Sequence, residues 1–201
     1  MYNVIALSKE RFASSSDDCT VKIWKDDNTH KCISTLKHNG YVRSIIQLRN
    51  KDVLVSCGYK SSTGLSFWNI NNYTQQYNIK RYSVYYSSHM IELYNGDIAL
   101  SSSIKPYPID FIDSSSYQVK KEIQSKEYII GESVLCMLNE HSFIYACKGI
   151  FLQISSDDYS ILYQSKEGRF KGFGGVVLIE GGQYVAIENK KRLTIIKPCY
   201  T

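Results

Sequence analysis

The feature that most constrains the fold of this chain is a short pattern that recurs five times at nearly constant spacing. In each copy a strand-like run ends on an aromatic or β-branched residue and a polar turn follows. These residues are Trp24, Trp68, Ile112, Ile154 and Ile196, so the copies lie 44, 44, 42 and 42 residues apart. Self-similarity at a period of about 20 to 50 residues indicates a repeat protein, in which each copy is one small structural unit.

Within each copy, short runs of alternating apolar residues are separated by clusters of Gly, Asn, Asp and Ser, which is typical of strands joined by tight turns. Four strands are expected in each of the first four copies and three in the last. The first two copies give Asn3–Leu7, Arg11–Ser15, Thr20–Lys25, Lys31–Leu36, Val42–Leu48, Val53–Cys57, Leu65–Asn69 and Gln75–Ile79. The others give Tyr86–Leu93, Asp97–Ser102, Ile109–Asp113, Gln118–Ile123, Glu132–Leu138, Ser142–Cys147, Phe151–Ser155, Ser160–Gln164, Gly174–Ile179, Gln183–Glu188 and Arg192–Lys197.

The first copy carries a family resemblance. Its run Phe-Ala-Ser-Ser-Ser-Asp-Asp-Cys-Thr-Val-Lys-Ile-Trp, from Phe12 to Trp24, resembles the signature of the WD40 repeat family, with Lys25 where the family's closing Asp usually stands. The resemblance implies an all-β, WD40-type β-propeller of about five blades of four antiparallel strands, the last blade incomplete. As one domain spanning residues 1–201, it would have blades at 1–36, 37–80, 81–124, 125–165 and 166–201.

Two alternatives concern the assembly of these blades. Five sets of inner strands but only four outermost strands are expected, so the chain is either a segment of a larger, perhaps seven-bladed, propeller or a five-bladed ring with one three-stranded blade. A β-sandwich would also explain the strands and turns. It would not explain the recurring aromatic–polar–x–x–x–Tyr pattern, which favours the propeller.

The resemblance also implies a hydrogen-bonded network inside each blade, built from a Trp, a Ser or Thr, an Asp and a His. The matching residues are Ser14, Asp18 and Trp24 in the first copy and His38, Ser56 and Trp68 in the second, which has no matching Asp. Ser, His and Asp are also the parts of a nucleophilic triad. However, Ser14 and Asp18 belong to one copy and His38 to the next, so a structural network is expected, with no catalytic residue and no enzymatic activity.

Metal and cofactor chemistry has little support in the sequence. The six cysteines, at positions 19, 32, 57, 136, 147 and 199, form no Cys-x-x-Cys pair and no Cys/His cluster with zinc spacing. We therefore expect no metal and no cofactor, and we expect Cys57, Cys136 and Cys147 to act as small buried apolar residues.

Charge is distributed unevenly over the expected turns. In a propeller, the connections after the second and fourth strands of each blade share one side, which we call the basic loop face. By sequence this face holds 12 basic and 4 acidic residues, whereas the opposite turns hold 4 basic and 9 acidic ones, although the whole chain is only +5. A basic face with Tyr side chains suits an acidic partner. The candidate partner-binding residues are Lys37, Tyr41, Tyr59, Lys60, Arg81, Tyr82, Lys105, Tyr107, Lys148, Arg169, Lys171 and Lys191.

The sequence therefore predicts a WD40-repeat scaffold that docks partner proteins within a multi-protein complex, through acidic or phosphorylated segments. The alternative is a binder of polyanions, RNA or acidic lipid headgroups, that uses the same face. No apolar run approaches the length of a transmembrane helix, and the first residues lack a signal-peptide profile. A cytoplasmic location is expected, with the nucleus as the alternative.

Overall fold

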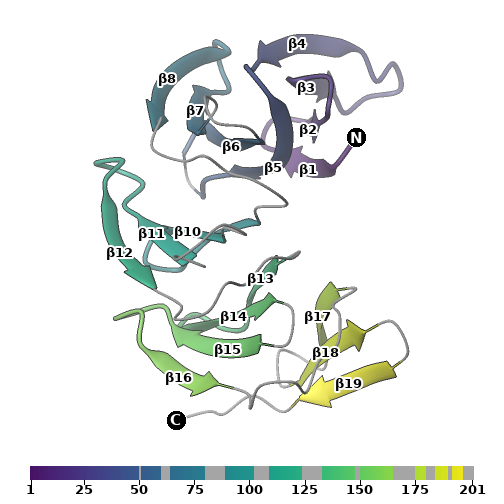
Figure 1. Cartoon of the computed structure of the whole chain (residues 1–201). Coiled ribbons are helices and arrows are strands. Elements are labelled where there is room, and N and C mark those ends of the chain that lie inside the picture. Colours follow the sequence, from purple (N-terminus) through teal and green to yellow (C-terminus); the bar gives the residue numbers. More distant parts are fainter. Residues whose placement is uncertain are drawn as a thin grey trace. The chain divides into compact units, whose positions relative to one another are not determined.

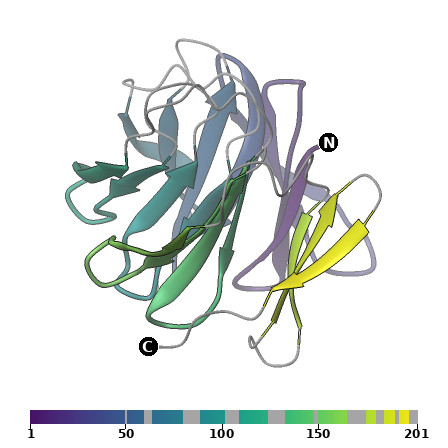
Figure 2. The ribbon, with the colours of Figure 1, turned by 60° about the horizontal axis from the view of Figure 1, so that its bottom comes forward.

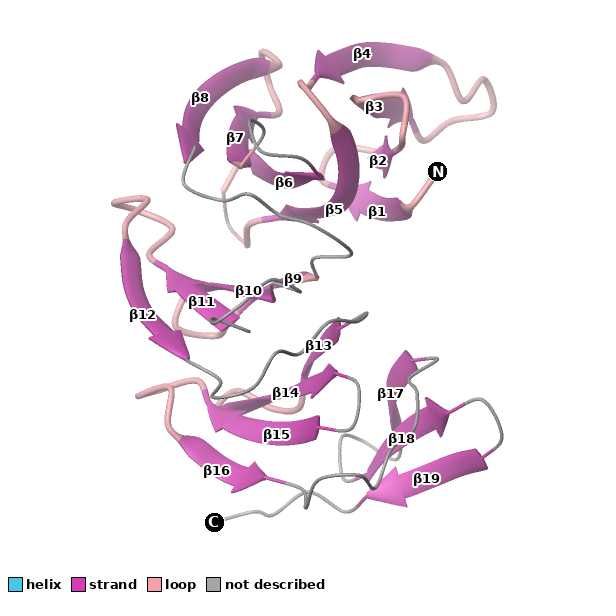
Figure 3. Cartoon of the chain, in the orientation of Figure 1, coloured by secondary structure: helices cyan, strands magenta, loops and turns pink. Residues whose placement is uncertain are grey.

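The fold is all-β. A computed structural model describes residues 1–49, 51–59, 64–79, 89–101, 109–123, 133–147, 150–164, 175–179, 184–189 and 192–196. These residues form strands and turns and no helix (Figure 3). The all-β prediction is therefore confirmed. Accordingly, the described residues contain no helix that could span a membrane.

The chain divides into two compact units, Met1–Met90 and Ile91–Thr201. The first unit holds two four-stranded sheets whose strands follow one another in chain order, each antiparallel to the next (Figure 1). The first sheet consists of β1 (Asn3–Leu7), β2 (Arg11–Ser15), β3 (Thr20–Lys25) and β4 (Cys32–Lys37). The second consists of β5 (Tyr41–Gln47), β6 (Val53–Tyr59), β7 (Leu65–Asn69) and β8 (Thr74–Ile79).

The second unit repeats this plan. Its first sheet consists of β9 (Met90–Glu92), which begins at the boundary between the units, β10 (Ile98–Ser101), β11 (Ile109–Ile112) and β12 (Val119–Ile123). The next is β13 (Ser133–Met137), β14 (Ser142–Cys147), β15 (Ile150–Ser155) and β16 (Ile161–Gln164), the green strands of Figure 2. A three-stranded sheet follows, with β17 (Gly175–Ile179), β18 (Tyr184–Asn189) and β19 (Arg192–Ile196).

Each of these strands overlaps a strand expected from the sequence, and several have the expected bounds. The largest difference is β9, which covers only Met90–Glu92 of the expected Tyr86–Leu93; the part of that prediction before residue 89 lies outside the described residues. The outermost strands β4, β12 and β16 start one residue later than expected. A residue with positive φ, His30, Tyr117 or Tyr159, stands two positions before each of these starts.

The repeat position of the sequence marks a recurring β-bulge. The register between the third and fourth strands shifts immediately before Trp24, Trp68, Ile112 and Ile154. A bulge bends its strand and increases the local twist. The four sheets therefore share a backbone irregularity, in addition to their strand order, at the spacing that the sequence predicted.

The turn after this bulge is built in the same way in three sheets. The side-chain oxygen of Asn69, Asp113 or Ser155 accepts hydrogen bonds from the backbone N–H groups two and three residues later, at 2.7–3.3 Å. The next residues are Tyr73, Tyr117 and Tyr159, with φ of 60°, 59° and 61°. A side-chain cap of this kind stabilises a tight turn. It explains why the sequence pattern ends in a polar residue and, four positions later, a Tyr.

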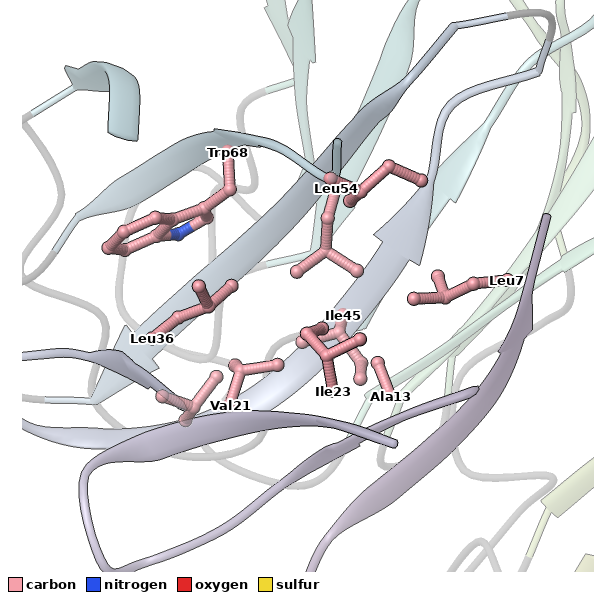
Figure 4. Packing of buried hydrophobic residues seen from close by; sticks show 10 residues of the cluster. Leu7, Ala13, Val21, Ile23, Leu36, Ile45, Leu54 and Trp68 are labelled. Carbon is pink, nitrogen blue, oxygen red and sulfur yellow. The ribbon is translucent and has the colours of Figure 1, made fainter. Parts of the chain in front are cut away.

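Two apolar clusters hold the sheets together within the units. In the first unit, β5 lies beside β1, β2 and β3. Ala13, Val21 and Ile23 of the first sheet face Ile45 and Leu54 of the second, and all five side chains are fully buried (Figure 4). In the second unit, a cluster centred on Phe111, Phe143 and Tyr145 joins the sheets β9–β12 and β13–β16. Each core is therefore a layer between consecutive sheets.

Ile45→Ala should lower the free energy of unfolding of the first unit by about 2 to 5 kcal/mol, because it removes apolar contacts and leaves a cavity between two sheets. Ile33→Ala is the matched control, because Ile33 on β4 is 38 % exposed, and it should cost less than about 1 kcal/mol. Urea denaturation followed by Trp fluorescence measures both. Equal costs for the two variants would contradict the layered core.

Candidate functional site

The described connections sort to opposite ends of the sheets within each unit. The turn between β2 and β3 is joined to the β4–β5 connection by backbone hydrogen bonds from His38 N to Cys19 O (2.9 Å) and from Val42 N to Ser16 O (3.0 Å). At the other end, the turns before the second and fourth strands are joined by bonds from Asp26 N to Glu10 O, Ile70 N to Asp52 O and Ser156 N to His141 O, at 2.7–2.9 Å. In the described part of the first unit, the β2–β3 turn and the β4–β5 connection therefore lie together at one end of the sheets, on the basic loop face.

A buried chain of hydrogen bonds runs through His38, Ser56 and Trp68. Trp68 Nε1 donates to Ser56 Oγ at 3.1 Å, and His38 Nε2 lies 2.8 Å from the same oxygen. The imidazole and indole rings also pack together, with centroids 5.2 Å apart. On the other side of the imidazole, Nδ1 lies 3.1 Å from the carbonyl oxygen of Leu36, the buried residue of β4. The chain therefore connects the last strand of the first sheet to two strands of the second.

The protonation of His38 follows from these contacts. A carbonyl oxygen can only accept, so Nδ1 carries the hydrogen that is donated to Leu36. Nε2 then accepts the hydroxyl hydrogen of Ser56, and Ser56 Oγ in turn accepts from Trp68. Burial lowers the pKa of His38 to about 4, because the charged form loses its hydration and no carboxylate among its contacts compensates for that loss. His38 is thus neutral at physiological pH.

In the first sheet the corresponding contacts are fewer. Trp24 Nε1 donates to Ser14 Oγ at 2.9 Å, and the Trp24 ring stacks on Phe12 with centroids 6.0 Å apart. Among the described contacts, Asp18 is not joined to this pair. Its carboxylate accepts hydrogen bonds from the backbone N–H of Thr20 at 3.0 Å and from the Thr20 hydroxyl at 2.7 Å. The bond from the hydroxyl is the main reason why the pKa of Asp18 is lowered. Asp18 therefore caps the β2–β3 turn, and the structure brings together only Ser14 and Trp24 of the three.

Most of the candidate partner-binding residues lie outside the described residues. These are Lys60, Arg81, Tyr82, Lys105, Tyr107, Lys148, Arg169, Lys171 and Lys191, and of Tyr59 only the backbone, at the end of β6, is described. Lys37 is the exposed last residue of β4, and Tyr41 is the partly buried first residue of β5. Both therefore stand at the basic loop face, on either side of His38.

The structure adds a cluster at this face that the sequence analysis missed. Arg43 lies 3.7 Å above the ring of Tyr2, which is a cation–π contact, and its guanidinium approaches Asp17 at 3.7 Å. The Tyr2 hydroxyl donates to Asp17 at 2.6 Å. Asp18, in turn, pairs with Lys22 at 3.8 Å. Strand alternation could have placed Arg43 beside Tyr41, since the buried residue Val42 stands between them.

Three of the acidic residues in the opposite turns pair with lysines. Asp27 lies 2.7 Å from Lys25, Asp52 lies 3.7 Å from Lys9, and Asp113 lies 3.1 Å from Lys120. Hydrogen bonds from Lys25 and Thr29 hold the pKa of Asp27 well below its usual range, and backbone N–H groups do the same for Asp113. The count of charges from the sequence did not include Lys120, which lies on a strand, so it overstated the negative charge of this end.

Two polar contacts of related geometry join consecutive sheets at this end. In the first unit, buried Arg11 donates from Nη1 to the carbonyl of Ile70 at 2.5 Å and to the Tyr73 hydroxyl at 3.4 Å. In the second unit, Asn95 Nδ2 donates to the carbonyl of Ser156 at 2.7 Å and to the Tyr159 hydroxyl at 3.1 Å. Ile70 and Ser156 share one repeat position, as do Tyr73 and Tyr159. We call these contacts the inter-sheet locks.

The lock of the second unit includes a buried carboxylate. Asp97 is 3 % exposed and accepts from the Tyr159 hydroxyl and from Lys120 Nζ, the latter at 2.9 and 3.0 Å. Burial, together with this bond, raises the pKa of Tyr159 to about 12. The recurring Tyr was visible in the sequence. Its partners were not, because Arg11, Asn95 and Asp97 differ in type between the sheets.

Among the described residues, no group of three or more His, Cys, Asp and Glu side chains could hold a metal ion. The sequence matches no protein-family model and no curated protein. What the chain does must therefore be argued from the sheets, the locks and the charges described above.

Ser56→Ala should lower the free energy of unfolding by about 2 to 4 kcal/mol, because it leaves both Trp68 N–H and His38 Nε2 without a partner in a buried site. Ser14→Ala, the matched control, removes one bond beside a partly exposed Trp24 and should cost about 1 kcal/mol or less. Urea denaturation of both variants makes the comparison. A cost at Ser14 equal to that at Ser56 would contradict the role given to the buried chain.

His38 should make stability fall on mild acidification. Its folded pKa of about 4 lies below the ordinary value of 6.5, so the unfolded state binds a proton first. The contribution of His38 to the free energy of unfolding is fully present above pH 6.5 and is lost as the pH falls from 6.5 towards 4. At about pH 4.5 the loss is about 2 to 3 kcal/mol. His38→Gln, which does not titrate, should show a shallower pH dependence in urea titrations. Identical slopes for the two proteins would exclude His38 as the cause.

Proposed function

We propose that the chain is a WD40-type β-propeller, or a segment of one, that serves as a scaffold for protein partners. The first support is the repeated plan, in which consecutive antiparallel sheets have their strands in chain order and share one bulge and one turn. The resemblance of the run from Phe12 to Trp24 to the family signature points the same way, and so does the contact between Trp68, Ser56 and His38.

A second support is the contact between the first strands of consecutive sheets. β1 lies beside β5 in the first unit, and β13 lies beside β17 in the second. A propeller places the first strand of every blade nearest the central axis, where first strands become neighbours. A crystal structure tests this proposal. Sheets set radially around one axis with first strands innermost are expected, whereas a two-layer sandwich would overturn it.

The proposed role is to dock acidic or phosphorylated segments of partner proteins on the basic loop face. The observation that carries it is the local charge balance around Lys37. The two described acidic residues of this face are Asp17, which pairs with Arg43, and Asp18, which pairs with Lys22. No described acidic side chain forms an ion pair with Lys37, which is exposed. An exposed cation at the face that also holds Tyr41 favours an acidic ligand, since complementary charge steers and orients a partner.

Lys37→Glu should weaken binding to acidic or phosphorylated peptides by about tenfold, because charge reversal replaces an attraction by a repulsion. Lys31→Glu is the matched control, because Lys31 precedes the opposite end of the same strand β4, and binding should be unchanged. Fluorescence anisotropy with a panel of phosphoserine and Glu-rich peptides measures both. The triple reversal of Arg81, Arg169 and Lys171 extends the test to residues that the structure does not describe.

Replacing the peptides by generic RNA or by vesicles of acidic lipid separates the proposed scaffold from a polyanion binder. A polyanion binder would still bind these ligands, with log affinity falling steeply and linearly with log salt. Equal loss in the Lys37 and Lys31 variants, or no loss in either, would overturn the assignment of the basic loop face as the docking surface.

A further inference from the structure

The second inter-sheet lock contains a chemically labile pair of residues. Asn95 is followed by Gly96 in the turn between β9 and β10, and Gly96 has a φ of +87°. Around an ideal Cβ position on Gly96, no heavy atom from beyond its two chain neighbours lies within 4 Å. A glycine at this place leaves its backbone nitrogen sterically open to the preceding side chain. Asparagine is a thermolabile residue type because its side-chain amide can be lost.

The reaction that Asn95 can undergo is an intramolecular substitution. The Gly96 nitrogen, after giving its proton to water, attacks Asn95 Cγ and forms a new C–N bond. The bond between Cγ and Nδ2 breaks, and the departing NH2 group takes one proton from solvent and leaves as ammonia. Water then opens the five-membered imide at either carbonyl, which gives aspartate or isoaspartate. The sequence of steps involves only water and no change of oxidation state.

In the closed structure every group needed for this attack is held elsewhere. Gly96 N donates to Leu93 O at 3.0 Å. The Asn95 side chain accepts from Asp97 N at 2.9 Å and donates to Ser156 and Tyr159 of the next sheet. Reaction of two groups requires them to approach in an aligned geometry. The lock must therefore open before the Gly96 nitrogen can reach Cγ.

We propose that Asn95 is a gated deamidation site, at which opening of the lock between the sheets β9–β12 and β13–β16 permits the reaction and the product prevents the lock from closing again. An aspartate at this position cannot donate to the carbonyl of Ser156. It also places a second carboxylate close to Asp97, which is buried and already bound by Tyr159 and Lys120. Like charges at such a distance disfavour one another. A transient opening is thus converted into a permanent one.

The test compares deamidation rates in the folded and unfolded protein. Purified protein is incubated in mildly alkaline buffer with and without urea, and the peptide containing residues 93–97 is analysed by mass spectrometry and isoaspartate labelling. The folded protein should react at least about tenfold more slowly, because only the open fraction reacts. Tyr159→Phe, which removes the hydroxyl from the lock, should raise the folded rate about fivefold, the factor for one hydrogen bond of ordinary strength. It should leave the rate in urea unchanged.

Tyr73→Phe is the matched control, because it weakens the equivalent lock in the first unit and should leave the rate at Asn95 unchanged. Asn95→Asp should lower the thermal stability of the protein, whereas Asn95→Gln should give no product at this position. Equal rates in the folded and unfolded protein, or the same folded rate in the wild type and in Tyr159→Phe, would overturn the gating. Absence of product in urea would overturn the site itself.

Discussion

Within each unit, the join between two consecutive sheets depends on a Tyr held in the left-handed conformation. A non-glycine residue with positive φ is uncommon and costs free energy. In this chain the cost is offset by the side-chain cap at the start of the same turn, from Asn69 or Ser155. The constrained turn points Tyr73 and Tyr159 at the preceding sheet, where each shares a donor with a backbone carbonyl. One local conformation thus helps to hold one pair of consecutive sheets together in each unit.

The two ends of the sheets use polar groups for different purposes. At the end with the locks, Asp27, Asp52 and Asp113 each pair with a Lys residue, so these three carboxylates help to hold turns and sheets. At the other end, His38 is neutral and occupied by Ser56 and Leu36, whereas Lys37 beside it extends into solvent. His38 therefore supports the fold. Lys37 is exposed, forms no ion pair with a described acidic side chain, and is the residue proposed to bind a partner.

Sequence alone located the strands well because alternation and turn residues are local signals. It also located the repeat position, since Trp24, Trp68, Ile112 and Ile154 each follow a bulge. Contacts between sheets could not be predicted in this way. Arg11 and Asn95 perform the same task with different chemistry, so no pattern of residue types connects them. For Asp18 the sequence pattern misled in the other direction. The resemblance to the WD40 signature predicted that Asp18 joins the network of Trp24, whereas its carboxylate caps its own turn.

The placement of the apolar clusters between sheets has a consequence for how heat would melt the protein. Each layer of core belongs to two neighbouring sheets, as with Ile23 against Ile45 or Phe111 against Phe143. For two sheets that share such a layer within a unit, the free energy of unfolding includes one term for each sheet and one for the interface between them. Two such sheets therefore melt together while their shared layer is intact, and a substitution that weakens the layer would separate their transitions.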